Sequence, residues 1–126
     1  METASQFIKR KKKQFETDLK KQRTISMKDI GRKGRFHFIR EAWTFMKQYN
    51  LKEKVFVIER LRKGETEGKV THSWNRGEIE YRIGYYIVSK SKTRKNKWVW
   101  GQFCPLVPDK DLKRLYDKAC KEGTIR

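Results

Sequence analysis

The sequence predicts an α+β domain with a four-stranded antiparallel meander, two N-terminal helices and one C-terminal helix. Three observations lead to this class. Apolar residues recur at helical spacing near both ends of the chain, they alternate with polar residues in the middle, and turn residues separate these segments. At 126 residues the chain has the length of one domain. We expect all the helices to cover one face of the sheet.

The first helix is predicted over residues 5–21, where Phe15 and Leu19 lie on one face. Five consecutive basic residues, Lys9–Lys13, interrupt its apolar pattern. Such a run is typical either of a solvated arm that is mobile or of a basic tail that becomes ordered on nucleic acid. We therefore divide the chain into a basic arm or helix over 1–23 and a single α+β domain over 24–126.

Two further helices are predicted from wider apolar stripes. A glycine-containing loop over 24–35 leads into a helix over 35–49, which carries two adjoining stripes of aromatic and aliphatic side chains. A C-terminal helix is predicted over 109–122. Asp109 is its expected N-cap, and Gly123 follows its last turn.

The middle of the chain predicts the sheet. Val55-Phe56-Val57-Ile58 is apolar at odd and even positions alike, which is typical of a central strand covered on both faces. The glycines of residues 64–68 indicate a turn. The predicted strands are 54–62, 69–74, 78–90 and 97–103.

The charge of the chain predicts its partner. Thirty-three Lys and Arg against fifteen Asp and Glu give a formal net charge of +18. Residues 1–23 and 24–63 hold most of this excess, residues 64–90 are balanced, and residues 91–105 hold four basic side chains and no acidic one. A small domain with this much like charge repels itself unless a polyanion is nearby, and nucleic acid is the commonest polyanion.

Basic side chains that lack neighbouring carboxylates gather in three segments, and two tryptophans follow the last of these. Cations at a hairpin tip would hold phosphates while the indoles stack on bases. Cations before a helix N-terminus would hold a phosphate, unless they belong to a solvated loop. The predicted nucleic-acid-binding residues are Lys9, Arg10, Lys11, Lys12, Lys13, Arg32, Lys33, Arg35, Lys92, Arg94, Lys95, Lys97, Trp98 and Trp100.

The sequence supports catalysis less strongly than it supports nucleic-acid binding. Glu67-Gly68-Lys69 has the acid-x-Lys form found in metal-dependent nucleases, and Glu59 or Glu53 would supply an upstream carboxylate. The same form arises readily by chance in a lysine-rich chain. The two cysteines and two histidines are too few and too scattered for a zinc site, so we expect no metal and no cofactor.

The sequence therefore predicts a small cytoplasmic protein, not an enzyme, that binds DNA or RNA through the phosphate backbone. Two alternatives stay open: a metal-dependent nuclease, and an adaptor that binds an acidic protein or a ribonucleoprotein surface. No segment has the roughly 18 consecutive apolar residues of a membrane span, so we expect no membrane partner.

Overall fold

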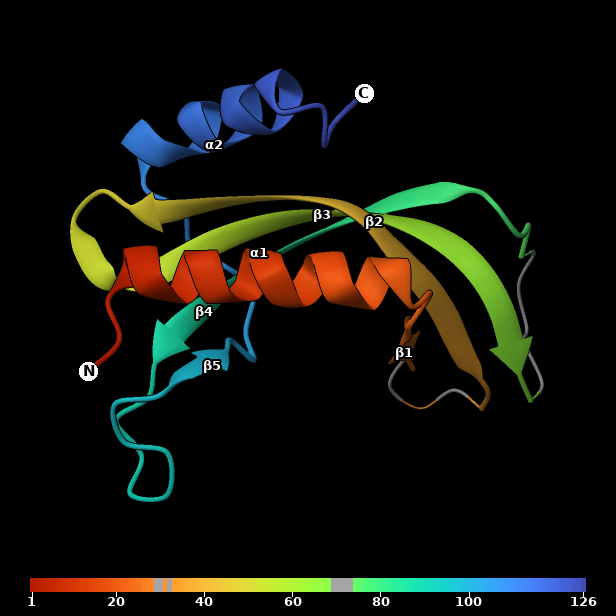
Figure 1. Ribbon diagram of the computed structural model, residues 1–126, viewed down its shortest axis with the longest axis horizontal. Coiled ribbons are helices and arrows are strands. Elements are labelled where there is room, and N and C mark those ends of the chain that lie inside the picture. Colours follow the sequence, from red (N-terminus) through yellow and green to blue (C-terminus); the bar gives the residue numbers. More distant parts are fainter. Residues whose placement is uncertain (29–30, 32, 69–73) are drawn as a thin grey trace.

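A computed structural model describes residues 1–28, 31, 33–68 and 74–126. It confirms the α+β class, and these residues form two helices and one antiparallel sheet of five strands in the order β1-β2-β3-β4-β5 (Figure 1). The elements in chain order are α1 (Ala4–Lys20), β1 (Thr24–Met27), β2 (Arg35–Gln48), β3 (Leu51–Glu67), β4 (Ile79–Val88), β5 (Trp98–Trp100) and α2 (Asp109–Lys121).

The sheet separates the two helices, as Figure 1 shows. On one face, Val55 and Val57 of β3 pack with Phe7 and Phe15 of α1. On the other face, Phe56 and Ile58 pack with Leu115 and Ala119 of α2. β3 is thus a central strand buried on both faces, as predicted. The expectation that all helices cover one face is wrong, because this two-sided apolar run needs a cover on each side.

The predicted helix over residues 35–49 is instead strand β2, which pairs antiparallel with β3 along its length. Its register shifts between Phe36 and Phe38 and again between Arg40 and Ala42. At the first shift the extra residue lies in β3, and only the second inserts a residue into β2 and exchanges its faces. Phe45 and Met46 also pack on opposite faces of the sheet, so apolar positions fall on both parities. The resulting mixture of spacings imitates a helical stripe, although aromatic and β-branched residues favour a strand.

The predicted turn over residues 64–68 is also wrong for most of its length, because β3 continues to Glu67. Gly64 lies inside the strand, where an added Cβ would come within 3.2 Å of the backbone oxygen of His37. The glycine therefore permits a close approach of β2 to β3 and does not end the strand.

The other strands agree with expectation in part. The predicted strand over 78–90 is β4, and the one over 97–103 is shortened to β5. The predicted strand over 69–74 lies outside the described residues apart from Trp74, which is not in a strand. The predicted C-terminal helix is α2, although its N-cap is Pro108 and not Asp109.

Residues 4–20 form helix α1, one of the two forms expected for the basic N-terminal segment. Thr3 and Gln6 form a capping box at its start, in which each side chain accepts a hydrogen bond from the other residue's backbone N–H. Phe7 and Phe15 are fully buried against the sheet. Whether residues 1–23 form a unit apart from the rest of the domain stays a prediction.

Candidate nucleic-acid interface

The connection between β4 and β5 is a hairpin tip with a fixed backbone. Ser89 N–H donates to the Lys97 carbonyl at 2.8 Å, and Asn96 N–H donates to the Ser89 carbonyl at 2.9 Å. Asn96 adopts the left-handed conformation, with φ of 64°, which Asn tolerates. The exposed basic side chains of this tip are Lys92, Arg94, Lys95 and Lys97. Within the part of the chain that the structure describes, none of these four forms an ion pair, so their charges are free for an anion.

A cavity of about 490 Å³ lies at the outer edge of β5, beside this tip. Arg94 and Trp100, two of the residues predicted to bind nucleic acid, both line it. Its other lining residues are Ser89, Ser91, Val99 and Gln102. The cavity thus combines a cation, an aromatic ring and small hydrogen-bonding groups. We refer to it as the Trp100 cavity.

Trp100 lies over β4 at Gly84, which has no side chain. A Cβ added to Gly84 would come within 2.4 Å of the indole, so only glycine accommodates the ring. The guanidinium carbon of Arg82 lies 4.6 Å from the centroid of the indole, and the Tyr86 ring meets it edge-on at 5.1 Å. Trp100 nevertheless remains 37% exposed. These contacts hold the ring in place and leave part of it accessible for stacking.

Lys11 reaches from α1 towards the same surface. Its Nζ lies 5.2 Å from the centroid of the Tyr86 ring and donates to Gln14 Oε1 at 3.1 Å. Burial, and then the charges of Arg10 and Arg40, lower the pKa of Lys11. Burial also raises the pKa of Tyr86 to about 12, so Tyr86 is neutral at physiological pH. Lys11 is thus a cation whose surroundings disfavour its charge, which an anion would relieve.

Beneath these residues lies a fully buried carboxylate, Glu59 on β3. Arg82 donates to it from Nε at 2.8 Å and from a terminal nitrogen at 3.1 Å. Arg40 of β2 donates to it from Nε. Two arginines therefore neutralise one carboxylate, and the cluster keeps a net positive charge.

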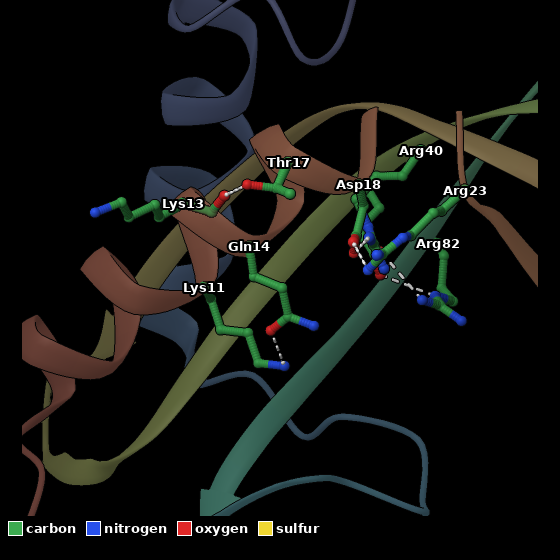
Figure 2. Close-up of polar contacts among 9 residues, drawn as sticks. Lys11, Lys13, Gln14, Thr17, Asp18, Arg23, Arg40 and Arg82 are labelled. Carbon is green, nitrogen blue, oxygen red and sulfur yellow. Dashed lines mark hydrogen bonds and ion pairs between the residues drawn. The ribbon is translucent and has the colours of Figure 1, made fainter. Parts of the chain in front are cut away.

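Asp18 near the end of α1 extends this cluster. It accepts a hydrogen bond from Arg23 at 3.2 Å and lies 4.0 Å from Arg40. Figure 2 shows Arg23, Arg40 and Arg82 converging beside Asp18, while Lys11 and Gln14 lie further along the helix. The network fixes the C-terminal half of α1 on the sheet and thereby fixes the position of Lys11.

Trp98 lies in the core, although the sequence groups it with Trp100. Its ring stacks on Phe7 at 4.7 Å with an interplanar angle of 16°, and its Nε1–H donates to the Glu2 carbonyl at 2.9 Å. Only 9% of Trp98 is exposed. Trp100 is therefore the better placed of the two for stacking on a base.

The remaining basic residues of α1 point in several directions, because successive residues of a helix are rotated by about 100°. Lys9, Lys12 and Lys13 are exposed, and Figure 2 shows Lys13 pointing away from Lys11. Arg10 is paired with Glu2 at 2.9 Å. Among the five, Lys11 is the one that lies over Tyr86, whose ring contacts Trp100.

The predicted phosphate site before the second helix depended on the free N–H groups of a helix N-terminus. That helix does not form, because Arg35 begins strand β2. Arg35 and Lys33 are exposed, and β2, which begins at Arg35, starts at the opposite end of the sheet from the hairpin tip (Figure 1). Arg32 lies outside the described residues. The structure therefore does not bring this basic segment together with the hairpin tip.

The candidate catalytic residues are also dispersed. Glu59 is held by two arginines, and Glu53 is bound to Lys90 at 2.9 Å. Glu67 lies eight residues from Glu59 on the same strand, about 26 Å away at the rise of a β-strand. Lys69 falls outside the described residues. Among the residues that the structure places, no three His, Cys, Asp or Glu side chains gather as metal ligands would.

Sequence reasoning missed Arg82 and Tyr86 as members of this surface. They alternate with Gly84 on one face of β4, and each contacts Trp100. A glycine inside an otherwise regular strand often marks the close approach of another group. Gly84 was therefore the available signal, although it does not say which group approaches.

No family model, curated protein or solved structure matches this chain.

Proposed function

We propose that this chain binds single-stranded nucleic acid, DNA or RNA, at the Trp100 cavity and the hairpin tip beside it. The observation that carries this proposal is that Arg94 and Trp100 line one cavity, next to cations that have no ion pair among the described residues. Arg94 would hold a phosphate, and Trp100 would stack on the adjoining base. Lys11 would receive the next phosphate on the side of α1.

The chemistry of the surface supports an unpaired strand over a duplex. Stacking on an aromatic side chain contributes about 1–3 kcal/mol per base, and every base has a face that can stack. A base inside a duplex already stacks on both of its neighbours and would have to leave the helix to reach Trp100. Ser89, Ser91 and Gln102 supply hydrogen-bonding groups in the cavity but no fixed pattern of charges. We therefore expect weak sequence preference.

A salt titration tests this proposal. A fluorescent oligonucleotide of about ten unpaired residues and a duplex of equal length are titrated with the protein at several salt concentrations. If about five phosphates are engaged, log K should fall with log salt at a slope of about −3.5 for the single strand. Salt-independent binding, or no binding at low salt, would overturn the proposal. Equal affinity for the duplex would retain nucleic-acid binding and remove the single-strand assignment.

No observation favours a second function to the same degree. A nuclease would need carboxylates that share a metal ion, and the candidates lie on different parts of the sheet. Within the described residues no helix is long and apolar enough to cross a membrane. Retention of a partner after nuclease digestion would instead favour the protein-binding adaptor, because association through nucleic acid is lost on digestion.

A further inference from the structure

Among the residues that the structure places, one stretch of β4 has an edge with no paired strand. β5 pairs with β4 at Tyr86, Ile87 and Val88, and the Tyr85 carbonyl accepts a bond from Gly101 N–H at 2.8 Å. Alternate residues of an antiparallel strand direct their backbone N–H and C=O groups to the same side. Tyr81 is four residues before Tyr85, so its N–H and C=O also point away from β3. Among the described residues, no strand pairs with this side of β4 before Tyr85. Such an edge is a template for another strand.

An apolar slot of about 280 Å³ lies beside this edge, between β4 and α2. Its walls are entirely hydrophobic side chains: Ile58, Tyr81, Ile83, Val107, Leu112, Leu115, Tyr116 and Ile125. Four of these are large and exposed, at 40% for Tyr81, 52% for Ile83, 60% for Leu112 and 54% for Tyr116. In a chain of which 38% is charged, such a patch indicates a surface that another molecule covers.

The sequence of the open edge is self-complementary. It reads Ile79-Glu80-Tyr81-Arg82-Ile83, which is symmetric about the tyrosine in chemical type. A second copy paired antiparallel, with a two-fold axis at Tyr81, would place Glu80 opposite the partner's Arg82 and Ile79 opposite the partner's Ile83. Apolar pairs at facing positions stabilise a sheet, and each pair occurs twice. Glu80 already pairs with Lys63 at 3.0 Å and Arg82 with Glu59, so the facing charges would add to existing ion pairs. An axis one residue later would instead oppose two Arg82 side chains.

We propose that the chain forms a two-fold dimer through the edges of β4 from Ile79 to Ile83, with the apolar slots beside the edges covered by the partner. The occupant is a second copy because the edge complements itself in the sign of its charges and in the apolar residues at facing positions. The balanced charge of residues 64–90 also makes this part of the chain the one least opposed to self-association. The hairpin tips would stay outside the contact, so the dimer would present two nucleic-acid sites.

Salt gives the dimer a signature opposite to that of nucleic-acid binding. Two subunits of charge +18 repel one another, and salt screens this repulsion beyond about 10 Å at 0.1 M. Dimerisation should therefore become tighter as salt rises, whereas nucleic-acid binding becomes weaker. Sedimentation equilibrium of the nucleic-acid-free protein measures dimerisation without nucleic-acid binding. The dimer proposal and the nucleic-acid proposal can therefore be disproved independently.

Cysteine crosslinking tests the register. In a background with Cys104→Ser and Cys120→Ser, Tyr81→Cys would place two thiols on the two-fold axis. A directly opposed, hydrogen-bonded pair has Cα atoms about 5.5 Å apart, within the range of a disulfide. The matched control is Ile83→Cys, because its two copies would lie four positions apart along the strands, about 13 Å. Circular dichroism confirms that each variant is folded.

We expect the wild type to dimerise in a concentration-dependent manner, Tyr81→Cys to form a disulfide-linked dimer under mild oxidation, and Ile83→Cys to form much less. Ile83→Glu, which buries two charges in the contact, should shift the protein to monomer at equal concentration. A wild type that stays monomeric at about 100 μM and high salt overturns the proposal. Equal crosslinking of the two cysteine variants, or a dimer that Ile83→Glu leaves intact, overturns it as well.

Discussion

Glu59 and Arg82 occupy facing positions of β3 and β4, and the Arg82 Nε lies 2.8 Å from the Glu59 carboxylate. The same guanidinium lies 4.6 Å from the centroid of the Trp100 ring. One arginine thus connects a buried carboxylate to a partly exposed aromatic. The carboxylate positions the arginine, and the arginine positions the indole that we propose as the stacking surface.

Glu59→Gln should destabilise the protein strongly, because it leaves Arg40 and Arg82 partly buried without their anion. Breaking a buried ion pair from one side costs about 3–5 kcal/mol. Urea unfolding measures this loss. Glu41→Gln is the control, because Glu41 also pairs with two arginines, Arg60 and Arg62, but lies nearer the surface. We expect the control to lose less than about 1 kcal/mol of unfolding free energy. Equal losses in the two variants would show that the burial of Glu59 adds nothing to the stability of its ion pairs.

Trp100→Ala should weaken binding of a single strand by about 1–3 kcal/mol, or roughly 5- to 150-fold, which is the range for one stacked base. Trp100→Phe should recover part of the affinity, because a smaller ring still stacks. Titration of a labelled oligonucleotide gives both values. If Trp100→Ala binds like the wild type, the indole serves packing alone.

The paired substitution Arg94→Ala with Lys95→Ala should weaken binding and make the salt slope shallower by about 0.7 for each lost phosphate contact on a single strand. Lys110→Ala with Lys113→Ala removes the same charge from exposed positions of α2, on the other side of the sheet. This control should change affinity much less. Equal effects of the two pairs would mean that net charge, and not the hairpin tip, determines binding.

Lys11→Met should raise the free energy of unfolding while it lowers affinity. Burial and the charges of Arg10 and Arg40 lower the pKa of Lys11, so its charged form is disfavoured in the folded state. Between the lowered pKa of the folded state and the ordinary lysine pKa of 10.5, the unfolded chain binds more protons, and stability rises with pH.

Urea unfolding of both proteins from pH 7 to 11 checks this prediction. The advantage of Lys11→Met over the wild type should shrink as the pH rises through that window. A variant that loses both stability and affinity would show that the Lys11 side chain is needed for packing.

Local patterns predicted the elements that depend on neighbours in the sequence. The apolar run at 55–58 predicted the central strand, and the periodicity after Pro108 predicted α2. β2 was missed because the residue inserted between Arg40 and Ala42, and the packing of Phe45 and Met46 on opposite faces, remove the alternation by which a strand is recognised. The correct reading of this segment requires its partner β3, which no short window contains.

The candidate site was predictable in charge but not in geometry. The acid-poor segment 91–97 indicated the hairpin tip, and Arg94 with Trp100 does line one cavity. The contacts of Lys11 with Tyr86 and of Arg82 with Glu59 join residues far apart in the chain. Such contacts follow from tertiary packing, which also places Trp98 in the core and Trp100 at the surface.

The positions of the two helices have a consequence for the order of folding. β2 and β3 are joined by a two-residue turn at Tyr49 and Asn50, so pairing can begin between Gln48 and Leu51 and extend from there, and this hairpin should form early. Helix α1, by contrast, packs Phe7 on the distant Trp98. Thr124, just after α2, bonds to Thr44 across 80 positions. Both helices therefore settle late, and until they do the long hairpin exposes an apolar surface on each side. Chaperones should recognise the chain at that stage, before the first and last elements close over it.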